Sequence, residues 1–187
     1  MLHTFLYTWV VWSMRFDINT TFTQKICGLE MYLCRIRKSA SFLIPMVADI
    51  SSPLAGGTHL PDITVITPVF DGEGKNISFY TASRGHHSEI GGILPGSMPA
   101  SSTKLYEEGA QIMSMFLVRD GVFNEEGISR VMVEETGAHS GCSGTRKLSD
   151  NLNDLKAQIA ANTKGATLVQ ALIRECGVKM VSSGSSC

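Results

Sequence analysis

Two apolar stretches near the middle of the chain have the composition of adjacent β-strands. Residues 63–70 (ITVITPVF) and 77–82 (ISFYTA) are rich in β-branched and aromatic side chains, which fit the pleated surface of a sheet. The connecting residues 71–76 (DGEGKN) are of the types that favour turns. This order of strand, turn and strand predicts a β-hairpin.

The register of that hairpin decides which polar residues meet at its open end. If Phe70 pairs with Ile77, antiparallel pairing places Asp62 opposite Gly85. The polar segments that flank the hairpin, GGTHLPD and SRGHHSEIGG, then lie side by side. The fold-back therefore brings three of the five histidines and two carboxylates to one place.

A second set of elements is predicted after the hairpin. Residues 101–103 offer N-cap candidates for a short helix. The apolar run at 112–118 is followed by a turn at 119–121 and a further apolar pair. This pattern indicates a second hairpin, or a strand that leads into a helix from Glu125.

The C-terminal part of the chain predicts one long helix over residues 150–174. Ser149 or Asp150 can cap its start, and the Cys-Gly pair at 176–177 is a plausible end. Leucine and isoleucine recur along one stripe of this segment, as in an amphipathic helix. The expected fold class is therefore α+β: β-hairpins and long loops with a long C-terminal helix.

Composition and charge limit the class of protein. The 187 residues are 43% hydrophobic and 18% charged, as expected for one globular domain with a core. The formal net charge of −1 and the lack of a basic stripe argue against nucleic-acid binding. The apolar residues 1–12 are too few to span a bilayer and no later segment is apolar enough, so no membrane partner is expected. Five widely spaced cysteines favour reduced thiols in a cytoplasmic protein.

The flanking segments of the hairpin form a candidate divalent-metal site from His59, Asp62, His86, His87 and Glu89. One carboxylate with two imidazoles leaves coordination positions open, which is typical of a catalytic metal. Neighbours in an extended segment point to opposite sides, so at most one of the two adjacent histidines is expected to be a ligand. The other could orient a ligand or handle a proton. The alternative is a turn capped by Asp62, with His59 merely hydrogen-bonded.

Arg84 and two glycines extend the candidate site toward a substrate. Arg84 could hold an anionic group through bidentate hydrogen bonds, and its alternative role is an ion pair with Glu89 or another acid. Gly91 and Gly92 could let the backbone approach a ligand, or could simply supply turns.

Other catalytic and nucleotide-binding motifs do not occur in the sequence. It has no P-loop, no Rossmann glycine pattern after a strand and no G-x-S-x-G nucleophile elbow. Cys142, with His139 close in sequence, is a weaker candidate nucleophile. The histidine and carboxylate cluster is therefore the leading catalytic hypothesis.

Several long motifs carry a resemblance to a known family. They are AGGTHLPDIT at 55–64, ASRGHH at 82–87, GGILPGSMP at 91–99, YEEGA at 106–110 and DNLNDLKAQIAAN at 150–162. With these motifs the chain resembles the hydantoinase B / 5-oxoprolinase family, and most of all its eukaryotic ATP-dependent members. The resemblance runs from about residue 52 to about residue 181.

The resemblance implies an activity and its cofactors. Family members open a cyclic amide, 5-oxo-L-proline, to L-glutamate with hydrolysis of ATP, a reaction of glutathione metabolism. It implies a divalent metal (Zn, Mn or Mg) held by His59, Asp62 and one of His86 or His87. Glu89 is then a base or an orienting residue, and Arg84 binds substrate. ATP and Mg are expected in a separate hydantoinase A-like portion, and the full-length family is expected to form homo-oligomers.

The resemblance also divides the chain. Residues 1–50 do not look like the family, residues 51–181 resemble part of a larger hydantoinase B-like domain, and residues 182–187 form a tail. The expected protein is a partial 5-oxoprolinase that needs its ATP-binding portion. The alternative is a non-catalytic, truncated remnant that binds metal or pairs with a full-length homologue.

Overall fold

The computed structural model describes residues 6–11, 47–50, 59–71, 73–74, 77–113 and 115–177. Most of the N-terminal segment 1–50 and the predicted tail at 182–187 lie outside these residues.

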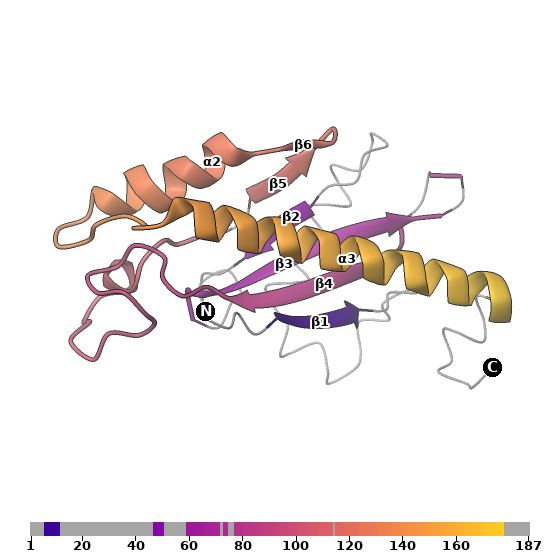
Figure 1. The fold of residues 1–187 in the computed structure, drawn as a ribbon, viewed down its shortest axis with the longest axis horizontal. Coiled ribbons are helices and arrows are strands. Elements are labelled where there is room, and N and C mark those ends of the chain that lie inside the picture. Colours follow the sequence, from indigo (N-terminus) through magenta and orange to yellow (C-terminus); the bar gives the residue numbers. More distant parts are fainter. Residues whose placement is uncertain are drawn as a thin grey trace.

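The strands form one six-stranded sheet in which all neighbours are antiparallel (Figure 1). Their order across the sheet is β1-β4-β3-β2-β5-β6. The strands are β1 (Leu6–Val11), β2 (Val47–Ile50), β3 (Asp62–Phe70), β4 (Ile77–His86), β5 (Met115–Arg119) and β6 (Val122–Phe123). Both predicted hairpins are therefore confirmed, and they belong to the same sheet.

The β3–β4 hairpin has a register that differs from the prediction by one residue. Phe70 pairs with Ile77 as expected, but a β-bulge beside Phe70 shifts every later rung. Asp62 consequently lies opposite His86 and not opposite Gly85. A bulge places one extra residue in one strand, and nothing in the composition of either strand marks its position.

The long C-terminal helix, α3 (Leu148–Cys176), is confirmed. Gly177 ends it with a φ of 79°, as the Cys-Gly pair predicted. The two predicted N-caps, Ser149 and Asp150, were wrong because both lie inside the first turn. The N-cap is Lys147, whose side chain makes no capping hydrogen bond.

Shorter helical segments flank the sheet. The helix predicted from Glu125 is present as α2 (Glu125–Ser129), which continues into the π-helical segment η4 (Arg130–Glu135). The short helix predicted after residue 103 is the 3-10 helix η3 (Leu105–Glu108). The observed fold is thus mixed α and β, as expected.

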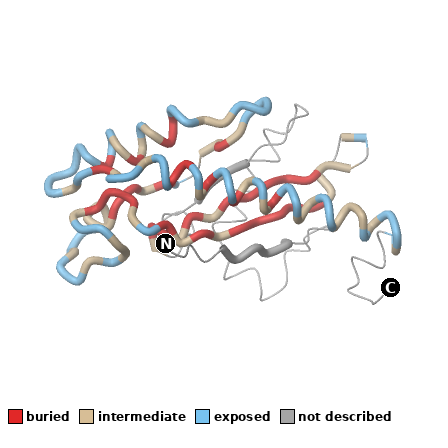
Figure 2. The backbone as a smooth tube through the Cα atoms, in the orientation of Figure 1, coloured by how far each residue is buried: buried red, intermediate tan, exposed pale blue. Residues whose placement is uncertain are grey.

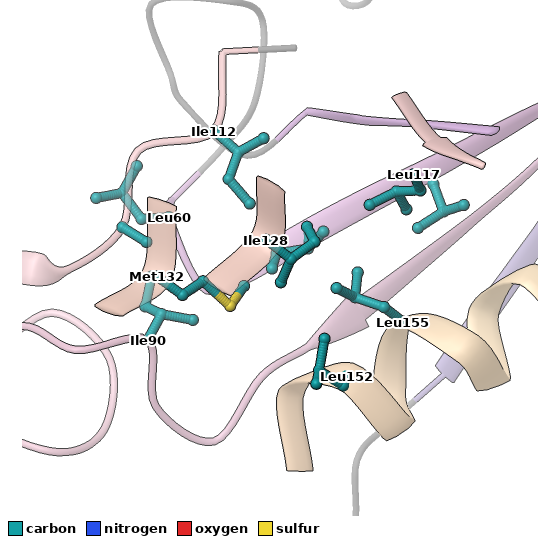
Figure 3. Packing of buried hydrophobic residues seen from close by; sticks show 11 residues of the cluster. Leu60, Ile90, Ile112, Leu117, Ile128, Met132, Leu152 and Leu155 are labelled. Atoms are coloured by element: carbon teal, nitrogen blue, oxygen red, sulfur yellow. The ribbon is translucent and has the colours of Figure 1, made fainter. Parts of the chain in front are cut away.

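The hydrophobic core lies between the sheet and the helices (Figures 2 and 3). Leu152 and Leu155 of the predicted apolar stripe pack here with Ile128 and Met132. Burying a side chain of this size stabilises the fold by about 1.5–3 kcal/mol. The stripe fits only the first half of α3, because Leu168 remains 57% exposed.

Two further findings concern the expectations from composition. Among the described residues, no helix combines the length and apolar character needed to cross a membrane. Cys142 is free, whereas Cys176 is disulfide-bonded. The expectation of five reduced thiols is therefore wrong for Cys176.

Candidate metal centre

Three side chains gather at the open end of the β3–β4 hairpin. Asp62 Oδ1 lies 2.8 Å from His86 Nδ1, and Asp62 Oδ2 lies 3.3 Å from His59 Nδ1. The two imidazole centroids are 5.1 Å apart. One potential ligand atom from each of the three residues lies within 4.8 Å of the others. This spacing and donor set fit a single divalent cation.

Local backbone structure sets these positions. Asp62 begins β3 and His86 ends β4, so the ladder itself pairs them. His59 reaches the same carboxylate through a tight turn, closed by a hydrogen bond of 3.0 Å from the Asp62 amide to the His59 carbonyl. Pro61 lies in that turn, where its ring restricts the backbone. Turn and ladder together hold two imidazoles on one carboxylate.

The cluster lies on the sheet face that points away from α3. The side chain of Ile63 lies in the core with Leu155 of α3, and the Ser83 hydroxyl donates to the carbonyl of Gln158 on the same helix. Side chains alternate between the two faces of a strand. Asp62 and His86 therefore project to the opposite face. All three members of the cluster are half-buried, with 21–43% of their side chains exposed. A cation there would keep positions open to water or substrate.

His87 lies apart from this cluster. It is fully buried, and its Nδ1 accepts a hydrogen bond of 3.1 Å from the Asn151 amide on α3. Burial lowers the pKa of His87 to about 4, so the ring is neutral at pH 7. Of the two adjacent histidines, the structure brings only His86 to Asp62, as strand alternation requires.

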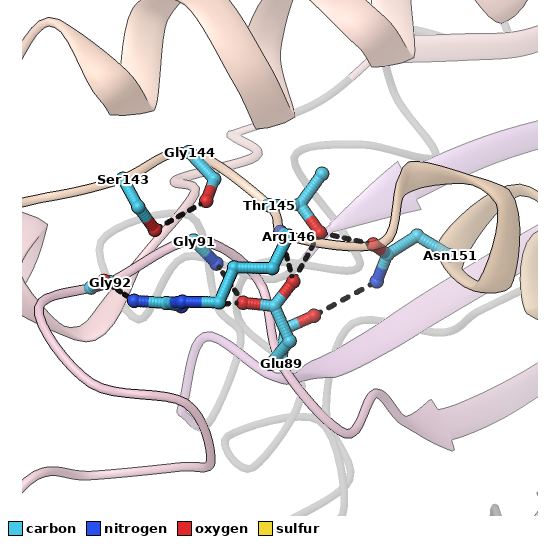
Figure 4. A network of polar contacts seen from close by, with 8 residues as sticks. All are labelled: Glu89, Gly91, Gly92, Ser143, Gly144, Thr145, Arg146 and Asn151. Atoms are coloured by element: carbon cyan, nitrogen blue, oxygen red, sulfur yellow. Dashed lines mark hydrogen bonds and ion pairs between the residues drawn. The ribbon is translucent and has the colours of Figure 1, made fainter.

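Glu89 is held inside a polar network (Figure 4). Its Oε1 accepts from the Thr145 hydroxyl (2.5 Å) and the Arg146 amide (2.6 Å), and its Oε2 accepts from the Arg146 guanidinium (2.8 Å) and the Gly91 amide (3.2 Å). Burial by itself raises the pKa of Glu89, but these hydrogen bonds outweigh it and lower the pKa. Glu89 is therefore an ionised anchor for the loop that precedes α3.

Arg84 lies two rungs along the ladder from the Asp62–His86 pair of the metal cluster. It is opposite Thr64 and two residues before His86, so it shares the face of the cluster. Its Nε donates a hydrogen bond of 2.9 Å to Thr64 Oγ1. The alternative ion pair with Glu89 is not formed, because Glu89 pairs with Arg146.

Gly91 and Gly92 make close backbone contacts inside the fold. A Cβ on Gly91, whose φ is +90°, would lie 2.4 Å from the carbonyl carbon of Gly144. A Cβ on Gly92 would lie 2.5 Å from the carbonyl oxygen of Glu107. Both contacts are with protein backbone, which accounts for the glycines by packing.

Cys142 is poorly suited to nucleophilic catalysis. Its Sγ donates a hydrogen bond of 3.2 Å to the Tyr106 carbonyl, and burial raises the pKa of its thiol. The ring of His139 stacks on Tyr106, with centroids 4.6 Å apart. Since the thiolate is the reactive form, this environment disfavours the candidate.

The sequence did not predict how α3 takes part in the site. The notable residues are Asn151 and Gln158, two buried polar residues of α3. Asn151 bonds to His87 and to the carbonyl of Glu89. Their spacing of seven residues places them on one helix face with Leu152 and Leu155, and this spacing was the available signal.

Comparison with known proteins identifies the family. Residues 47–185 match the sequence profile of the Hydantoinase B/oxoprolinase family, and the chain belongs to it.

The similar proteins are much longer than this chain. It is 58% identical to 5-oxoprolinase of Saccharomyces cerevisiae, over 66% of this chain and 10% of the yeast protein. It is 52% identical to 5-oxoprolinase 1 of Arabidopsis thaliana, over 70% of this chain and 10% of the plant protein. The crystal structure of an ATP-dependent caprolactamase from Pseudomonas jessenii shares the fold, with a TM-score of 0.61 and 24% identity over 83% of this chain and 25% of that one. The chain thus spans about a tenth of the length of the curated relatives it matches.

Proposed function

We propose that this chain is the metal-binding part of an ATP-dependent hydrolase of cyclic amides, with 5-oxo-L-proline as substrate and L-glutamate as product. The observation that carries the proposal is the cluster of His59, Asp62 and His86. It lies in a chain that is 58% identical to a yeast protein named 5-oxoprolinase.

The three residues of the cluster would hold one divalent cation. Two imidazoles and one carboxylate suit Zn²⁺ or Mn²⁺ better than Mg²⁺, which prefers oxygen ligands and retains several waters. When bound, such a cation supplies Lewis-acid chemistry: it activates water or polarises a carbonyl group. Asp62 contributes the negative charge, and the β3–β4 ladder fixes its position opposite His86.

Arg84 would bind the carboxylate of the substrate. It lies on the same face as the cluster, roughly 7 Å from His86 along the strand. Its Nε already contacts Thr64, which leaves the planar guanidinium held at one side for a bidentate pair. A small molecule with a carboxylate at one end and an amide at the other, such as 5-oxoproline, would place its carboxylate at Arg84 and its amide toward the cluster.

Glu89 would act as an orienting residue and not as a base. A carboxylate offers about four lone-pair sites, and four donors occupy those of Glu89. Its contacts link the loop at 89–92 to the start of α3. Gly91 and Gly92 would serve the site indirectly, by allowing these backbone segments to approach closely.

The ATP-dependent step would require a hydantoinase A-like portion. This chain matches only about a tenth of its 5-oxoprolinase relatives, and its sequence contains neither a P-loop nor a Rossmann glycine motif. We expect ATP with Mg²⁺ to bind in that other portion, in the cytoplasm, and the complete assembly to be a homo-oligomer. The small matched share is also the observation behind a second candidate, a non-catalytic remnant that binds metal or a full-length homologue.

A chimeric enzyme tests the proposal. Residues 47–177 would replace the matching segment of the yeast 5-oxoprolinase, and glutamate release would be measured with 5-oxoproline, with and without ATP. We expect ATP-dependent release, and its loss in a chimera with His59→Ala and Asp62→Ala. A folded, metal-loaded chimera that releases no glutamate would refute the enzyme proposal and favour the remnant.

A further inference from the structure

Three buried amide side chains follow one face of α3. They are Asn151, Gln158 and Asn162, each at most 3% exposed. Burying an amide without hydrogen bonds costs free energy, and each of these donates to groups of the sheet or of the loop beside it. This polar row belongs to the motif at 150–162, to which the proposed function assigns no role.

Gln158 joins the two strands that carry the metal cluster. Its Nε2 donates to the carbonyl of Ile63 on β3 (3.0 Å) and to the carbonyl of Ser83 on β4 (3.2 Å). The Ser83 hydroxyl donates in return to the Gln158 backbone carbonyl, at 3.4 Å. Ile63 directly follows Asp62 in the chain. A single side chain therefore links both strands within three residues of His86.

Gly85 leaves the space that this contact needs. It pairs with Ile63 in the ladder and directly precedes His86. A Cβ at this position would lie 3.1–3.3 Å from the three amide atoms of Gln158. This spacing is tighter than most Cβ contacts, so an added methyl group would require the amide to shift by a few tenths of an ångström. The amide of Gln158 therefore packs against the backbone of Gly85, on the sheet face opposite the cluster.

We propose that Gln158 is a positioning residue that fixes Asp62 and His86 at metal-binding separation. The inference rests on the proposed function, since it assumes that the cluster binds metal. Asp62 and His86 occupy the last rung of the hairpin, and beyond it the two strands are joined by a hydrogen bond of 2.9 Å from the His87 amide to the Pro61 carbonyl and by no further ladder pair. A metal site requires its ligands to stay within about 0.5 Å of their proper places. The two bonds of Gln158 supply that restraint from the opposite face of the sheet.

Asn162 provides a matched control. Its Nδ2 donates to the Val65 carbonyl (2.9 Å) and to Thr67 Oγ1 (3.2 Å). It is as buried as Gln158 and likewise donates two hydrogen bonds, but both go to β3 and lie further from the ligand rung. Loss of either amide should reduce stability. Only the loss of Gln158 should reduce metal affinity beyond that general effect.

The experiment compares Gln158→Met and Asn162→Leu in the 187-residue chain. Binding of Zn²⁺ and of Mn²⁺ would be measured by calorimetry, and melting temperature by circular dichroism. We expect Gln158→Met to weaken metal binding by about tenfold or more, the usual effect of losing a group that supports a ligand. Asn162→Leu should lower the melting temperature but leave metal affinity within about twofold of the parent.

Gly85→Ala supplies a second, independent variant, with the same expected loss of metal affinity. It covers the case in which Gln158→Met does not fold. Equal metal affinity in the parent and in the folded Gln158 or Gly85 variants would overturn the positioning role, as would equal losses in the Gln158 and Asn162 variants. A parent chain that binds neither metal would overturn the metal site itself, and the two failures are thus distinguishable.

Discussion

Asp62 and His86 face each other across the last rung of the β3–β4 hairpin, with Oδ1 and Nδ1 2.8 Å apart. His87, the next residue, points to the other side and contacts Asn151 on α3. The strand therefore separates two adjacent histidines into different environments. One shares a carboxylate with His59, and the other is buried and neutral.

This separation predicts different effects for the two histidines. His86→Ala should remove metal from the purified chain, because it deletes one of three ligands. His87→Leu should retain metal, while lowering the free energy of unfolding by about 1–3 kcal/mol because the buried Asn151 amide loses an acceptor. Elemental mass spectrometry after gel filtration and urea unfolding measure the two effects. Metal loss in the His87 variant alone would show that His87, and not His86, is the metal ligand.

The elements around this site could be predicted from local sequence patterns. The β-branched runs of β3 and β4 are strand-like over their whole length, and the turn residues between them fix the hairpin. The meeting of His59 and Asp62 with His86 follows from that fold-back. The register did not follow, because a bulge beside Phe70 depends on packing between strands and not on the residues of one strand.

The contacts across long sequence separations could not be predicted from local patterns. Glu89 is tied to Arg146, 57 residues later, and this pairing replaces the expected alternative with Arg84. The spacing of Asn151 and Gln158 places them on one helix face, but it does not show that they are buried, since an asparagine or glutamine on a helix usually faces solvent. Gln158 is buried because carbonyl groups of two strands accept its hydrogen bonds.

The network of Glu89 predicts a pH-dependent contribution to stability. Glu89→Gln should lower the free energy of unfolding by about 1–3 kcal/mol at pH 7, because charged hydrogen bonds to Thr145 and Arg146 are lost. The pKa of Glu89 is lowered in the folded state. Its contribution is therefore complete above the pKa of the unfolded chain and is lost as the pH falls through the folded pKa.

Urea unfolding at pH 7 and at successively lower pH measures this contribution. The difference between the parent and Glu89→Gln should shrink on acidification. Glu134→Gln, at an exposed position on the helix, is the control and should change stability by less than about 0.5 kcal/mol. A difference for Glu89→Gln that grows toward low pH would contradict the assigned network.

Two glycines with similar φ values allow the cost of backbone strain to be separated from the cost of a close contact. Gly91 and Gly96 have φ values of 90° and 100°, but a Cβ would contact backbone only at Gly91. Gly96→Ala should cost roughly 1–2 kcal/mol from backbone strain alone. Gly91→Ala should cost roughly 1–3 kcal/mol more, because the Gly144 backbone must move. Thermal and urea unfolding measure both costs, and equal costs would show that this close contact does not matter.

We expect a substitution of Arg84 to weaken substrate binding without changing metal binding. In the chimeric enzyme, Arg84→Lys should raise the KM for 5-oxoproline by roughly tenfold or more, because an ammonium group cannot form the bidentate pair with a carboxylate. Metal content should not change, since Arg84 is outside the cluster of His59, Asp62 and His86. Steady-state kinetics and elemental analysis of the same preparation measure both quantities.

The control for Arg84 is Arg119→Lys, an exposed arginine on β5 whose guanidinium lies over Phe116. It should leave KM within about twofold, because a surface substitution far from a site changes free energies by about 0.5 kcal/mol or less. If Arg84→Lys instead lowered kcat and metal content together with an unchanged KM, Arg84 would support the cluster and would not bind the carboxylate. The carboxylate of the substrate would then have to be bound by a group other than Arg84, although Arg84 lies on the same ladder as Asp62 and His86.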